Sequence, residues 1–552
     1  MIRLLASMSL IAPVALLSLA ACTTEPQPEE PQISLETMQQ VTRTLSSDAF
    51  EGREPGTPGG ARTVEYLIEQ FQAAGLQPGN AGSWTQEVPL VEITASDFAP
   101  LSVGELEFEH GSEWVGISYP QVERTEIADS ELVFVGYGIN APERDWNDYE
   151  GLDMEGKTAL ILVNDPDYLE ETLEGPFNGR AMTYYGRWRY KFEEAARQGA
   201  TAAIVIHEDY AASYGWNVVE GGWTGAQAYA DSGDGGMNNT AMNGWMTQDA
   251  AARIVAAEGL DFDELIEAAS QPGFEAVPFG QSVSTSFDNA IRRFTSKNVI
   301  GVLPGNQAPT EYVLHTAHWD HLGRCGAPED EDQICNGAVD NATGTAALVT
   351  LAAAHAEAGP TARTQVFLAV TAEESGLLGS EYYGANPVYP LDRTVGGVNI
   401  DALYVLGEAS DVTVIGGGKS ALDSYLAAAL EAQGRAATPD AAPQAGRYYR
   451  SDHFSLAKRG VPMFYVKSGQ TLTEGGAEAG EAAYQDYNTN HYHAASDEYS
   501  DEWDWAGVMQ DLELYFMLAR ALGDGGEWPN WNEGDEFRAI RDASCASDDA
   551  GC

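Results

Sequence analysis

Apolar segments of strand length alternate with helix-forming segments between residues 290 and 405. The strand-like runs are NVIGVLPG, YVLHTAH, TQVFLAVTA and VGGVNIDAL. A helix-forming segment, ATGTAALVTLAAAHAEAG, separates the second run from the third and ends at Gly359-Pro360. Strands that alternate with helices bury their apolar faces as a sheet with helices on both sides. The sequence therefore predicts an α/β fold with a mixed, mostly parallel central sheet.

Acidic and histidine residues stand at the ends of these strands and in the adjoining loops. At the strand ends are His318, Glu373, Glu374 and Asp401, while Asp340 precedes a helix and His493 lies in a later loop. Ligands gather at the carboxyl ends of strands in such sheets, so these side chains are expected to meet at one edge. A two-metal site needs a carboxylate shared by both ions, further imidazole and carboxylate ligands, and a free carboxylate beside a water molecule. This set contains the residue types for all of these roles.

Each acidic residue also has an ordinary explanation. An Asp before a helix, such as Asp340, is often an N-cap, and the Glu373-Glu374 pair can be a solvated helix start. Adjacent carboxylates at the end of a buried strand are nevertheless costly unless they bind something. Because adjacent side chains point in different directions, one of the pair can bind a metal while the other accepts a proton.

The residues alone do not decide which histidines bind metal. Besides His318 and His493, the candidates are His315, His321 and His491. Asp320 stands two positions after His318 at a strand end, a spacing that places both side chains on one face. Its carboxylate is expected to fix the tautomer of a metal-binding imidazole as an outer-shell partner.

The N-terminus has the pattern of an export signal. A positive charge precedes the apolar residues 4–20, and Leu19-Ala20-Ala21-Cys22 resembles a bacterial lipobox. Residues 1–21 are predicted to be a lipoprotein signal peptide, and residues 22–33 a tether that carries lipid on Cys22. An ordinary secretory signal with a chance cysteine is the alternative. We expect an exported protein, lipid-anchored in an outer membrane and facing the periplasm or the cell surface.

Charge narrows the range of partners. The chain has 84 acidic and 29 basic residues and a net charge of −55. Nucleic-acid binding depends on cationic patches, so this balance argues against it. A solvated acidic surface that keeps the protein soluble is the simplest explanation, and loose binding of many cations is the alternative.

Four further cysteines form two local pairs in the sequence. They are Cys325, Cys335, Cys545 and Cys552. Disulfides within each pair are expected in an oxidising compartment. The first would close the acidic loop between His318 and Asp340, and the second would hold the C-terminal tail. Neither pair has the short spacing of zinc ligands.

The middle of the chain predicts a separate α/β unit. The strand-like segments ELVFVGYGI, KTALILV and TAAIVIH accompany the helix-forming YKFEEAARQGA and long Gly-rich polar stretches. The predicted division is residues 34–125 for the first part of the main domain, 126–285 for an inserted domain, 286–525 for the second part and 526–552 for a C-terminal tail.

Several motifs together resemble the M28 family of zinc aminopeptidases. They are AHWDHLG, NGAVDNATG, AEESGLLGS, NIDA, YHAASDE and, at residues 450–462, RSDHFSLAKRGVP. The likeness covers roughly residues 35–125 and 290–525, and it implies the zinc-exopeptidase fold with two Zn²⁺ ions. The middle segment resembles a protease-associated (PA) domain inserted into the peptidase.

The family resemblance also implies a role for each residue. The implied zinc ligands are His318, Asp340, Glu374, Asp401 and His493, with Asp340 bridging the ions. Glu373 is the implied general base that activates a water molecule shared by the metals, and Tyr492 the implied oxyanion-stabilising residue. The resemblance prefers His493 over His491 because the family has a His three residues before a Ser-Asp pair, here Ser496-Asp497. It further suggests a cis peptide between Asp340 and Asn341.

The activity implied by the resemblance is removal of N-terminal residues from peptides by a metalloprotease. A carboxypeptidase or dipeptidase needs cationic groups that hold a substrate carboxylate, and Arg447 and Arg450 keep this alternative open. A non-catalytic binding protein on the same scaffold is a further alternative. Loss of metal ligands would indicate such a protein, whereas all five ligands and the base are present.

Overall fold

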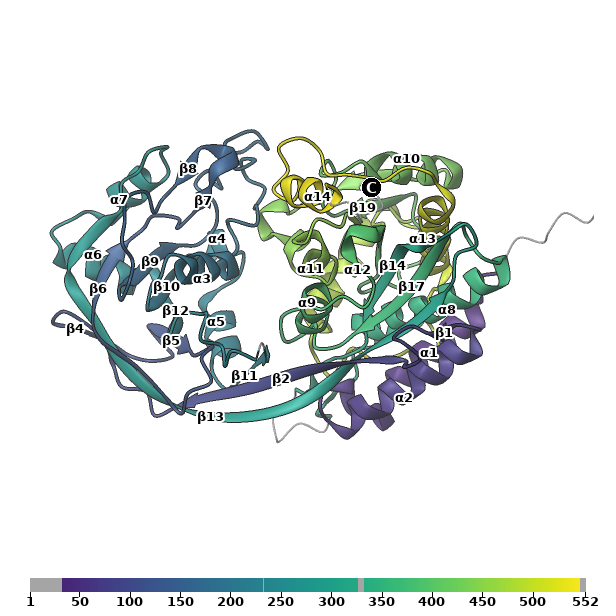
Figure 1. The fold of residues 1–552 in the computed structure, drawn as a ribbon, viewed down its shortest axis with the longest axis horizontal. Helices are drawn as coiled ribbons and strands as arrows, with labels where there is room; N and C mark the ends of the chain where they lie inside the picture. The colour runs from purple at the N-terminus through teal and green to yellow at the C-terminus, as the bar shows by residue number, and fades with distance from the viewer. Residues whose placement is uncertain (1–31, 232, 326–331, 547–552) are drawn as a thin grey trace, which may run out of the picture.

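A computed structural model describes residues 32–231, 233–325 and 332–546. They form a larger and a smaller lobe, joined by a long two-stranded ribbon (Figure 1). The predicted signal peptide and Cys22 lie outside the described residues, as does Cys552. None of the helices in the described part combines the length and the apolar character needed to span a membrane.

The larger lobe contains the predicted mixed sheet. Its strands follow the order β1 (Gln77–Pro78), the end of β13 (Val277–Leu303), β17 (Arg363–Val370), β14 (Ala308–His318), β18 (Thr394–Asn399), β21 (Met463–Ser468), β19 (Asp411–Val414) and β20 (Ala436–Pro439). The four central strands β17, β14, β18 and β21 are parallel. Their carboxyl ends therefore lie along one edge, as the sequence predicts.

Helices cover both faces of this sheet. Along β14, Val313 packs into a core with α1, α2, α8 and α13, whereas the adjacent Leu314 packs into a core on the other face with α9 and α11. The helices of the lobe are α1 (Leu35–Leu45), α2 (Pro58–Ala73), α8 (Gly344–Ala358), α9 (Leu378–Ala385), α10 (Leu422–Gln433), α11 (His453–Ala457), α12 (Gly476–Asn490), α13 (Ala506–Asp524) and α14 (Arg538–Cys545). This alternation of buried side chains explains why the strands are apolar along their whole length.

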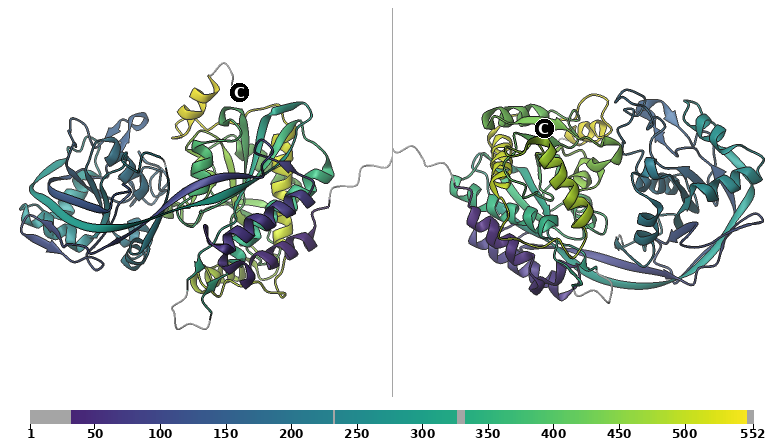
Figure 2. Two further views of the ribbon diagram at one scale, coloured as in Figure 1. Left: turned by 60° about the horizontal axis from the view of Figure 1, so that its bottom comes forward. Right: turned by 180° about the vertical axis from the view of Figure 1, so that it is seen from behind.

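A ribbon of two antiparallel strands connects the lobes. Strand β2 (Thr85–Ser96) pairs with β13 from Thr85 opposite Val299 to Ser96 opposite Asp288. Beyond this ribbon β13 continues into both lobes, where it pairs with β17 at one end and with β6 at the other. The views in Figure 2 show that this ribbon runs along one side of the molecule.

The smaller lobe has its own sheet and its own cores. Its parallel strands are β6 (Arg124–Phe134), β9 (Thr158–Leu162), β10 (Ala202–His207) and β12 (Met242–Thr247), with β5 (Trp114–Ile117) antiparallel beside β12. Its other elements are β3 (Leu101–Val103), β4 (Leu106–Phe108), β11 (Ala226–Ala230), α3 (Trp188–Arg197), α4 (Asp209–Ala212), α5 (Trp216–Trp223), α6 (Gln248–Ala257) and α7 (Phe262–Ala269). The predicted insertion, residues 126–285, lies within this lobe. Strands β3–β5 also pack here, although the sequence assigns them to the preceding domain.

The C-terminal segment packs on the larger lobe. Trp531 and Phe537 are each 2 % exposed and join the core around α11. Arg541 of α14 donates hydrogen bonds to the carbonyl groups of Leu391 and Thr394. A disulfide joins Cys325 to Cys335, with 5.7 Å between the Cα atoms, beside the hairpin of β15 (Gly323–Arg324) and β16 (Ile334–Cys335).

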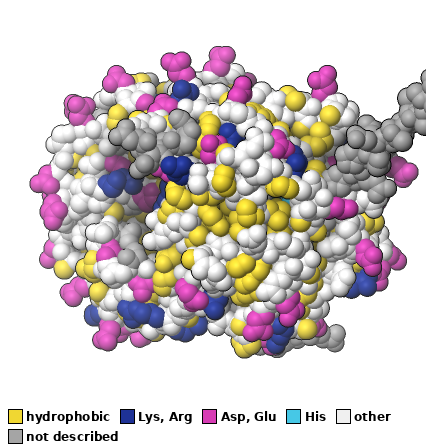
Figure 3. Space-filling model, turned by 45° about the vertical axis from the view of Figure 1, so that its right-hand side comes forward, with side chains coloured by type: hydrophobic (Ala, Val, Ile, Leu, Met, Phe, Trp, Pro, Cys, Tyr) yellow, Lys and Arg dark blue, Asp and Glu magenta, His cyan; other side chains and the backbone are white. Residues whose placement is uncertain are grey.

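Acidic side chains are spread over the molecular face seen in Figure 3. They alternate there with neutral and apolar groups and do not form a single continuous patch. This distribution matches the solvated acidic surface expected from the net charge.

A buried arginine holds together the loops at the carboxyl edge of the sheet. Arg53 is fully buried. Its guanidinium donates to the carbonyl oxygens of Trp319 and Gly337 at 2.9 Å, and also to those of Leu45 and Asn336. Burial lowers the pKa of Arg53 to about 10, although nearby carboxylates oppose the shift. The N-terminal helices are thereby connected to two loops that carry candidate metal ligands.

We expect Arg53→Met to destabilise the larger lobe strongly. The substitution keeps an apolar stem but leaves four carbonyl groups without their donor, which costs about 3–5 kcal/mol of unfolding free energy. Urea denaturation measures this change. The matched control is Arg62→Met on the exposed face of α2, with an expected change within about 0.5 kcal/mol. Equal stability of the two variants would contradict the bracing role.

Candidate metal centre

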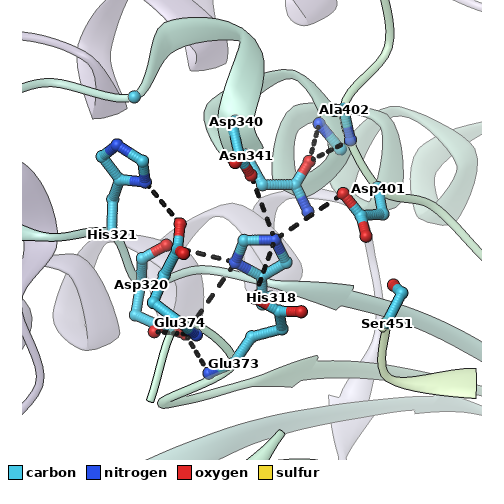
Figure 4. A network of polar contacts seen from close by, with 12 residues as sticks. His318, Asp320, His321, Asp340, Asn341, Glu373, Glu374, Asp401, Ala402 and Ser451 are labelled. Carbon is cyan, nitrogen blue, oxygen red and sulfur yellow. Dashed lines mark hydrogen bonds and ion pairs between the residues drawn. The ribbon is translucent and has the colours of Figure 1, made fainter. Parts of the chain in front are cut away.

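Five predicted site residues meet at the carboxyl edge of the sheet, namely His318, Asp340, Glu373, Glu374 and Asp401 (Figure 4). His318 is the last residue of β14, Glu373 and Glu374 follow β17, and Asp401 follows β18. Asp340 lies in the turn before α8, and the turn after α12 carries His493. Five separate segments thus contribute, which is why no single motif identifies the site.

His318 lies among three carboxylates. Its Nε2 is 3.4 Å from Asp340 Oδ1, 3.9 Å from Glu373 Oε2 and 3.9 Å from Asp401 Oδ1. Its Nδ1 donates a hydrogen bond to a backbone carbonyl at 3.2 Å. This bond places a proton on Nδ1 and leaves Nε2 facing the acidic side chains. Burial opposes the shift, but Glu373 and Asp340 raise the pKa of His318 well above its usual value, so Nε2 also carries a proton that a bound metal would replace.

A second histidine lies on the opposite side of Asp340. His493 Nε2 is 3.3 Å from Asp340 Oδ2 and 3.1 Å from Glu374 Oε2. One carboxylate oxygen of Asp340 therefore lies near each imidazole, which is the arrangement that a carboxylate shared by two metal ions requires.

The donor set suits divalent metal ions. The ligand atoms of His318, Asp340 and Glu374 lie within 4.8 Å of one another, and so do those of His318, Glu373 and Asp401. Imidazole nitrogens and carboxylate oxygens are the usual ligands of zinc. The side chains are buried, with exposed fractions of 2 % for His318, 6 % for Asp340 and 7 % for Glu374. The residues present fit zinc.

The acidic groups differ in their protonation. Burial would raise the pKa of Asp340, but hydrogen bonds from His318 and His493 hold it well below its usual value. Asp401 also has a lowered pKa, because Lys467 and His318 outweigh its burial. Burial raises the pKa of Glu373 well above its usual value. The positive charge of His318 opposes this shift, and the negative charge of Glu374 adds to it.

Glu374 belongs with the charged carboxylates. His493 and His321 lower its pKa to about 2 despite its burial and the charge of Asp340. The contact with His321, 2.6 Å from Nδ1 to Glu374 Oε1, was not predicted from the sequence. His321 therefore orients a predicted ligand, and its position three residues after His318 is the signal that marks it as part of the same loop.

The other rival histidines lie outside the cluster. His315 is fully buried, contacts the side chain of Gln365 at 2.8 Å and stacks on Phe367. His491 contacts the backbone carbonyl of Ser496 at 3.0 Å. The Nε2 atom of His491 lies 3.8 Å from Asp486 Oδ2, whereas that of His493 lies beside both Asp340 and Glu374.

Asp320 acts differently from the prediction. The backbone carbonyl of Asp320, and not its carboxylate, accepts the hydrogen bond from His318, and its Oδ1 lies 4.0 Å from that imidazole. The carboxylate instead accepts the backbone N–H groups of Glu373 at 3.1 Å and Glu374 at 3.4 Å. The strand end turns its carbonyl toward the ring, so the side chain is free to hold the next loop.

Two further residues shape the loop of Asp340. The peptide bond between Asp340 and Asn341 is cis, as the family resemblance suggests. The Asn341 side chain accepts the N–H of Ala402 at 3.0 Å and donates to Ile400 O at 3.2 Å, on either side of Asp401. Asp497 accepts the N–H groups of Val339 and Asp340. Asn341 and Asp497 both lie within the sequence motifs, but their hydrogen-bond partners are distant in sequence, so the motifs alone do not reveal these contacts.

Tyr492 lies at the mouth of the site. Its side chain is 41 % exposed and its ring stacks on His493 at 3.9 Å between centroids. The burial of its hydroxyl and the charges of Asp340 and Glu374 raise its pKa well above the usual value, while Arg450 opposes the shift. The hydroxyl is thus protonated and able to donate a hydrogen bond.

Comparison with known proteins agrees with this site. Residues 298–517 match the model of peptidase family M28. They are a peptidase M28 domain. The matched segment contains His318, Asp340, Glu373, Glu374, Asp401 and His493. The resemblance to M28 enzymes is thereby confirmed for this part of the larger lobe, while the likeness of the smaller lobe to a PA domain stays a prediction.

Individual relatives are more distant. Aminopeptidase NAALADL1 of Mus musculus is 31 % identical over 139 residues, which are 24 % of this chain and 17 % of that protein. The structure of an aminopeptidase from Aneurinibacillus sp. strain AM-1 has 19 % identity and a TM-score of 0.47, covering 91 % of this chain and 96 % of its own. BSAP, a zinc aminopeptidase from Bacillus subtilis, has 17 % identity and a TM-score of 0.42, covering 92 % and 100 %.

We expect His493→Ala to lower the zinc content of the M28 domain, because it removes an imidazole that lies beside both Asp340 and Glu374. Loss of an outer-shell partner typically costs about 10–100-fold in metal affinity, and loss of a ligand itself is expected to cost at least as much. Metal analysis after dialysis against dilute chelator measures the effect. His491→Ala is the control, since its imidazole lies outside the cluster. Full zinc content in His493→Ala would disprove the ligand assignment.

Proposed function

We propose that this protein is a di-zinc exopeptidase that removes N-terminal residues from peptides. The observation that carries the proposal is the position of Asp340 between His318 and His493, with Glu373 beside the same cluster. In this assignment His318, Asp340 and Asp401 would hold one zinc ion. Asp340, Glu374 and His493 would hold the other.

Bound zinc would supply a water molecule of lowered pKa and polarise the substrate carbonyl. Glu373 would accept a proton from the attacking water and deliver it to the leaving amine. This role suits a carboxylate that is 11 % exposed and lies within 3.9 Å of His318 without a short contact to it. The protonated hydroxyl of Tyr492 would donate a hydrogen bond to the oxygen that becomes negative.

The excess of acidic groups favours a substrate with a free amine. Besides the four carboxylates nearest the histidines, Asp452 is buried close enough to raise the pKa of Glu373. These carboxylates can accept hydrogen bonds from a positively charged N-terminus even when bound zinc balances their charge, whereas they offer no donor to a substrate carboxylate. We therefore propose aminopeptidase action before the alternatives.

One observation supports the carboxypeptidase or dipeptidase alternative. Arg447 pairs with Asp440 at 3.3 Å and is thus neutralised. Arg450 is exposed and directly precedes Ser451, which binds Asn399 at 2.7 Å beneath the site. Among the described residues, no carboxylate lies within 4.0 Å of the Arg450 guanidinium. Carboxypeptidase or dipeptidase action would require a short substrate whose C-terminal carboxylate reaches Arg450.

The cellular setting is also part of the proposal. We propose that residues 1–21 direct export and that Cys22 carries a lipid that anchors the protein in a membrane. The disulfide between Cys325 and Cys335 supports an oxidising compartment. The smaller lobe is proposed to be a PA-type insertion, and peptides are the proposed partners.

A substrate panel tests the assigned activity. It contains aminoacyl p-nitroanilides, the same compounds with acetylated amines, and dipeptides with free or amidated C-termini. An aminopeptidase hydrolyses the free-amine compounds regardless of the C-terminus and loses activity with a chelator. Preference for free C-termini together with tolerance of acetylation would favour the carboxypeptidase instead. Zinc-loaded protein that hydrolyses none of them would overturn the proposal.

We expect Glu373→Gln to retain zinc and to lose activity. Gln keeps the size of the side chain but cannot accept the proton, which lowers kcat by about 10²–10⁴-fold. Metal analysis and steady-state kinetics on an aminoacyl p-nitroanilide measure the two effects. Unchanged turnover in a zinc-loaded variant would remove Glu373 from the role of base.

A further inference from the structure

The loop that carries Glu373 and Glu374 is held in a tight turn. The backbone N–H groups of Gly376 and Leu377 both donate to the Glu373 carbonyl, at 2.7 and 2.8 Å. Gly376 has a φ of +102° and Leu377 one of +65°. From within the larger lobe, the Asp320 carboxylate fixes the start of this turn through the N–H groups of Glu373 and Glu374.

A residue of the smaller lobe fixes the other end of the turn. Arg189 lies at the start of α3, and its guanidinium donates a hydrogen bond of 2.9 Å to the carbonyl oxygen of Gly376. A Cβ atom at Gly376 would lie 2.3 Å from Arg189 Nη2. The guanidinium is therefore packed closely against the turn, and the absence of a side chain at Gly376 allows this approach.

The neighbouring contacts keep α3 in place against the larger lobe. Glu193, one turn after Arg189, pairs with Lys458 at 3.5 Å. The ring of Tyr184 lies 5.1 Å from that of Phe454. These contacts reach α11 and the residue that follows it, whereas Arg189 reaches the turn of the proposed base. Docking of the lobes and bracing of the turn are thus carried by different side chains.

We infer that Arg189 is a positioning residue for Glu373 and Glu374, so that the smaller lobe helps to assemble the metal centre of the larger one. The inference rests on the proposed function for its catalytic consequence. Its structural part, the placement of Glu374, applies to metal binding alone. Arg189 contacts neither a proposed ligand side chain nor the reacting atoms, and acts through the backbone of the turn.

The physical basis is the strength and the geometry of this hydrogen bond. A hydrogen bond from a guanidinium is stronger than one between neutral groups, and here it is partly shielded from water. Without it, the Gly376 carbonyl loses its donor and the turn is held from one side only. Displacement of a catalytic group by about 1 Å can cost 100-fold in rate, and loss of outer-shell support typically costs about 10–100-fold in metal affinity or activity.

The test compares three variants of the full chain. Arg189→Ala removes the brace. Lys458→Ala removes an ion pair between the lobes and a pair with Glu381 of α9 inside the larger lobe, but it keeps the hydrogen bond from Arg189 to Gly376. Arg197→Ala is the control on the same helix, because Arg197 pairs with Glu194 at 2.7 Å within the smaller lobe. Calorimetric titration of the metal-free proteins with zinc gives affinities, and kinetics on an aminoacyl p-nitroanilide gives kcat and KM.

We expect Arg189→Ala to lower kcat and the affinity for the more weakly bound zinc by about tenfold or more each, with KM nearly unchanged. Millimolar methylguanidinium should restore part of the lost activity, since it can replace the missing donor. The Arg197→Ala and Lys458→Ala variants should stay within about twofold of the original protein.

Two results would overturn the inference. One is Arg189→Ala with the original zinc affinity and kcat. The other is an equal loss in Lys458→Ala, which would assign the effect to lobe docking in general. If the unmodified protein hydrolyses none of the substrates, the proposed function fails, and the zinc titration still decides whether Arg189 positions Glu374.

Discussion

The larger lobe is organised around a buried excess of negative charge. Asp340, Glu373, Glu374 and Asp401 converge on His318 and His493 at the carboxyl edge of the sheet. Carboxylates that are buried together repel one another and lose their hydration, so such a cluster is stable only with compensating cations or shared protons. The histidines supply part of that compensation, and bound zinc would supply more of it.

The loops are held by groups that are not among the proposed metal ligands. Arg53 binds carbonyl groups of the loops after β14 and before Asp340, Asp320 binds the N–H groups of the Glu373 loop, and Asn341 binds the backbone on both sides of Asp401. Each contact joins segments that are distant in sequence. The geometry of the ligands is therefore a property of the folded lobe, and a ligand substitution and a brace substitution are expected to affect metal affinity through different routes.

The sequence predicted the parts of the site that follow from strand ends, since parallel strands place their last residues along one edge. It missed Arg53, because three of its four carbonyl partners lie more than 250 residues away. It also assigned Asp320 to His318 through the carboxylate, because the direction of a carbonyl cannot be seen in a pattern. The sequence also assigned strands β3–β5 to the main domain, whereas they pack in the smaller lobe, for a similar reason. They are short, and their partners β12 and β13 lie far along the chain. Residue patterns describe local periodicity, whereas these assignments depend on long-range contacts.

The connection between the lobes bears on how the site is assembled. Strand β13 extends through both lobes, but outside them it is paired with β2 alone over much of the ribbon. Strand β2 also pairs with β11 of the smaller lobe from Leu90 to Thr94, whereas from Thr85 to Val88 the ribbon is a two-stranded pair, which twists readily. Side-chain contacts such as Lys458 with Glu193 add to what the strands fix. Arg189 reaches the Glu373 turn from the same helix but through a different side chain, so the inferred brace of the turn is separate from the contacts that orient the lobe.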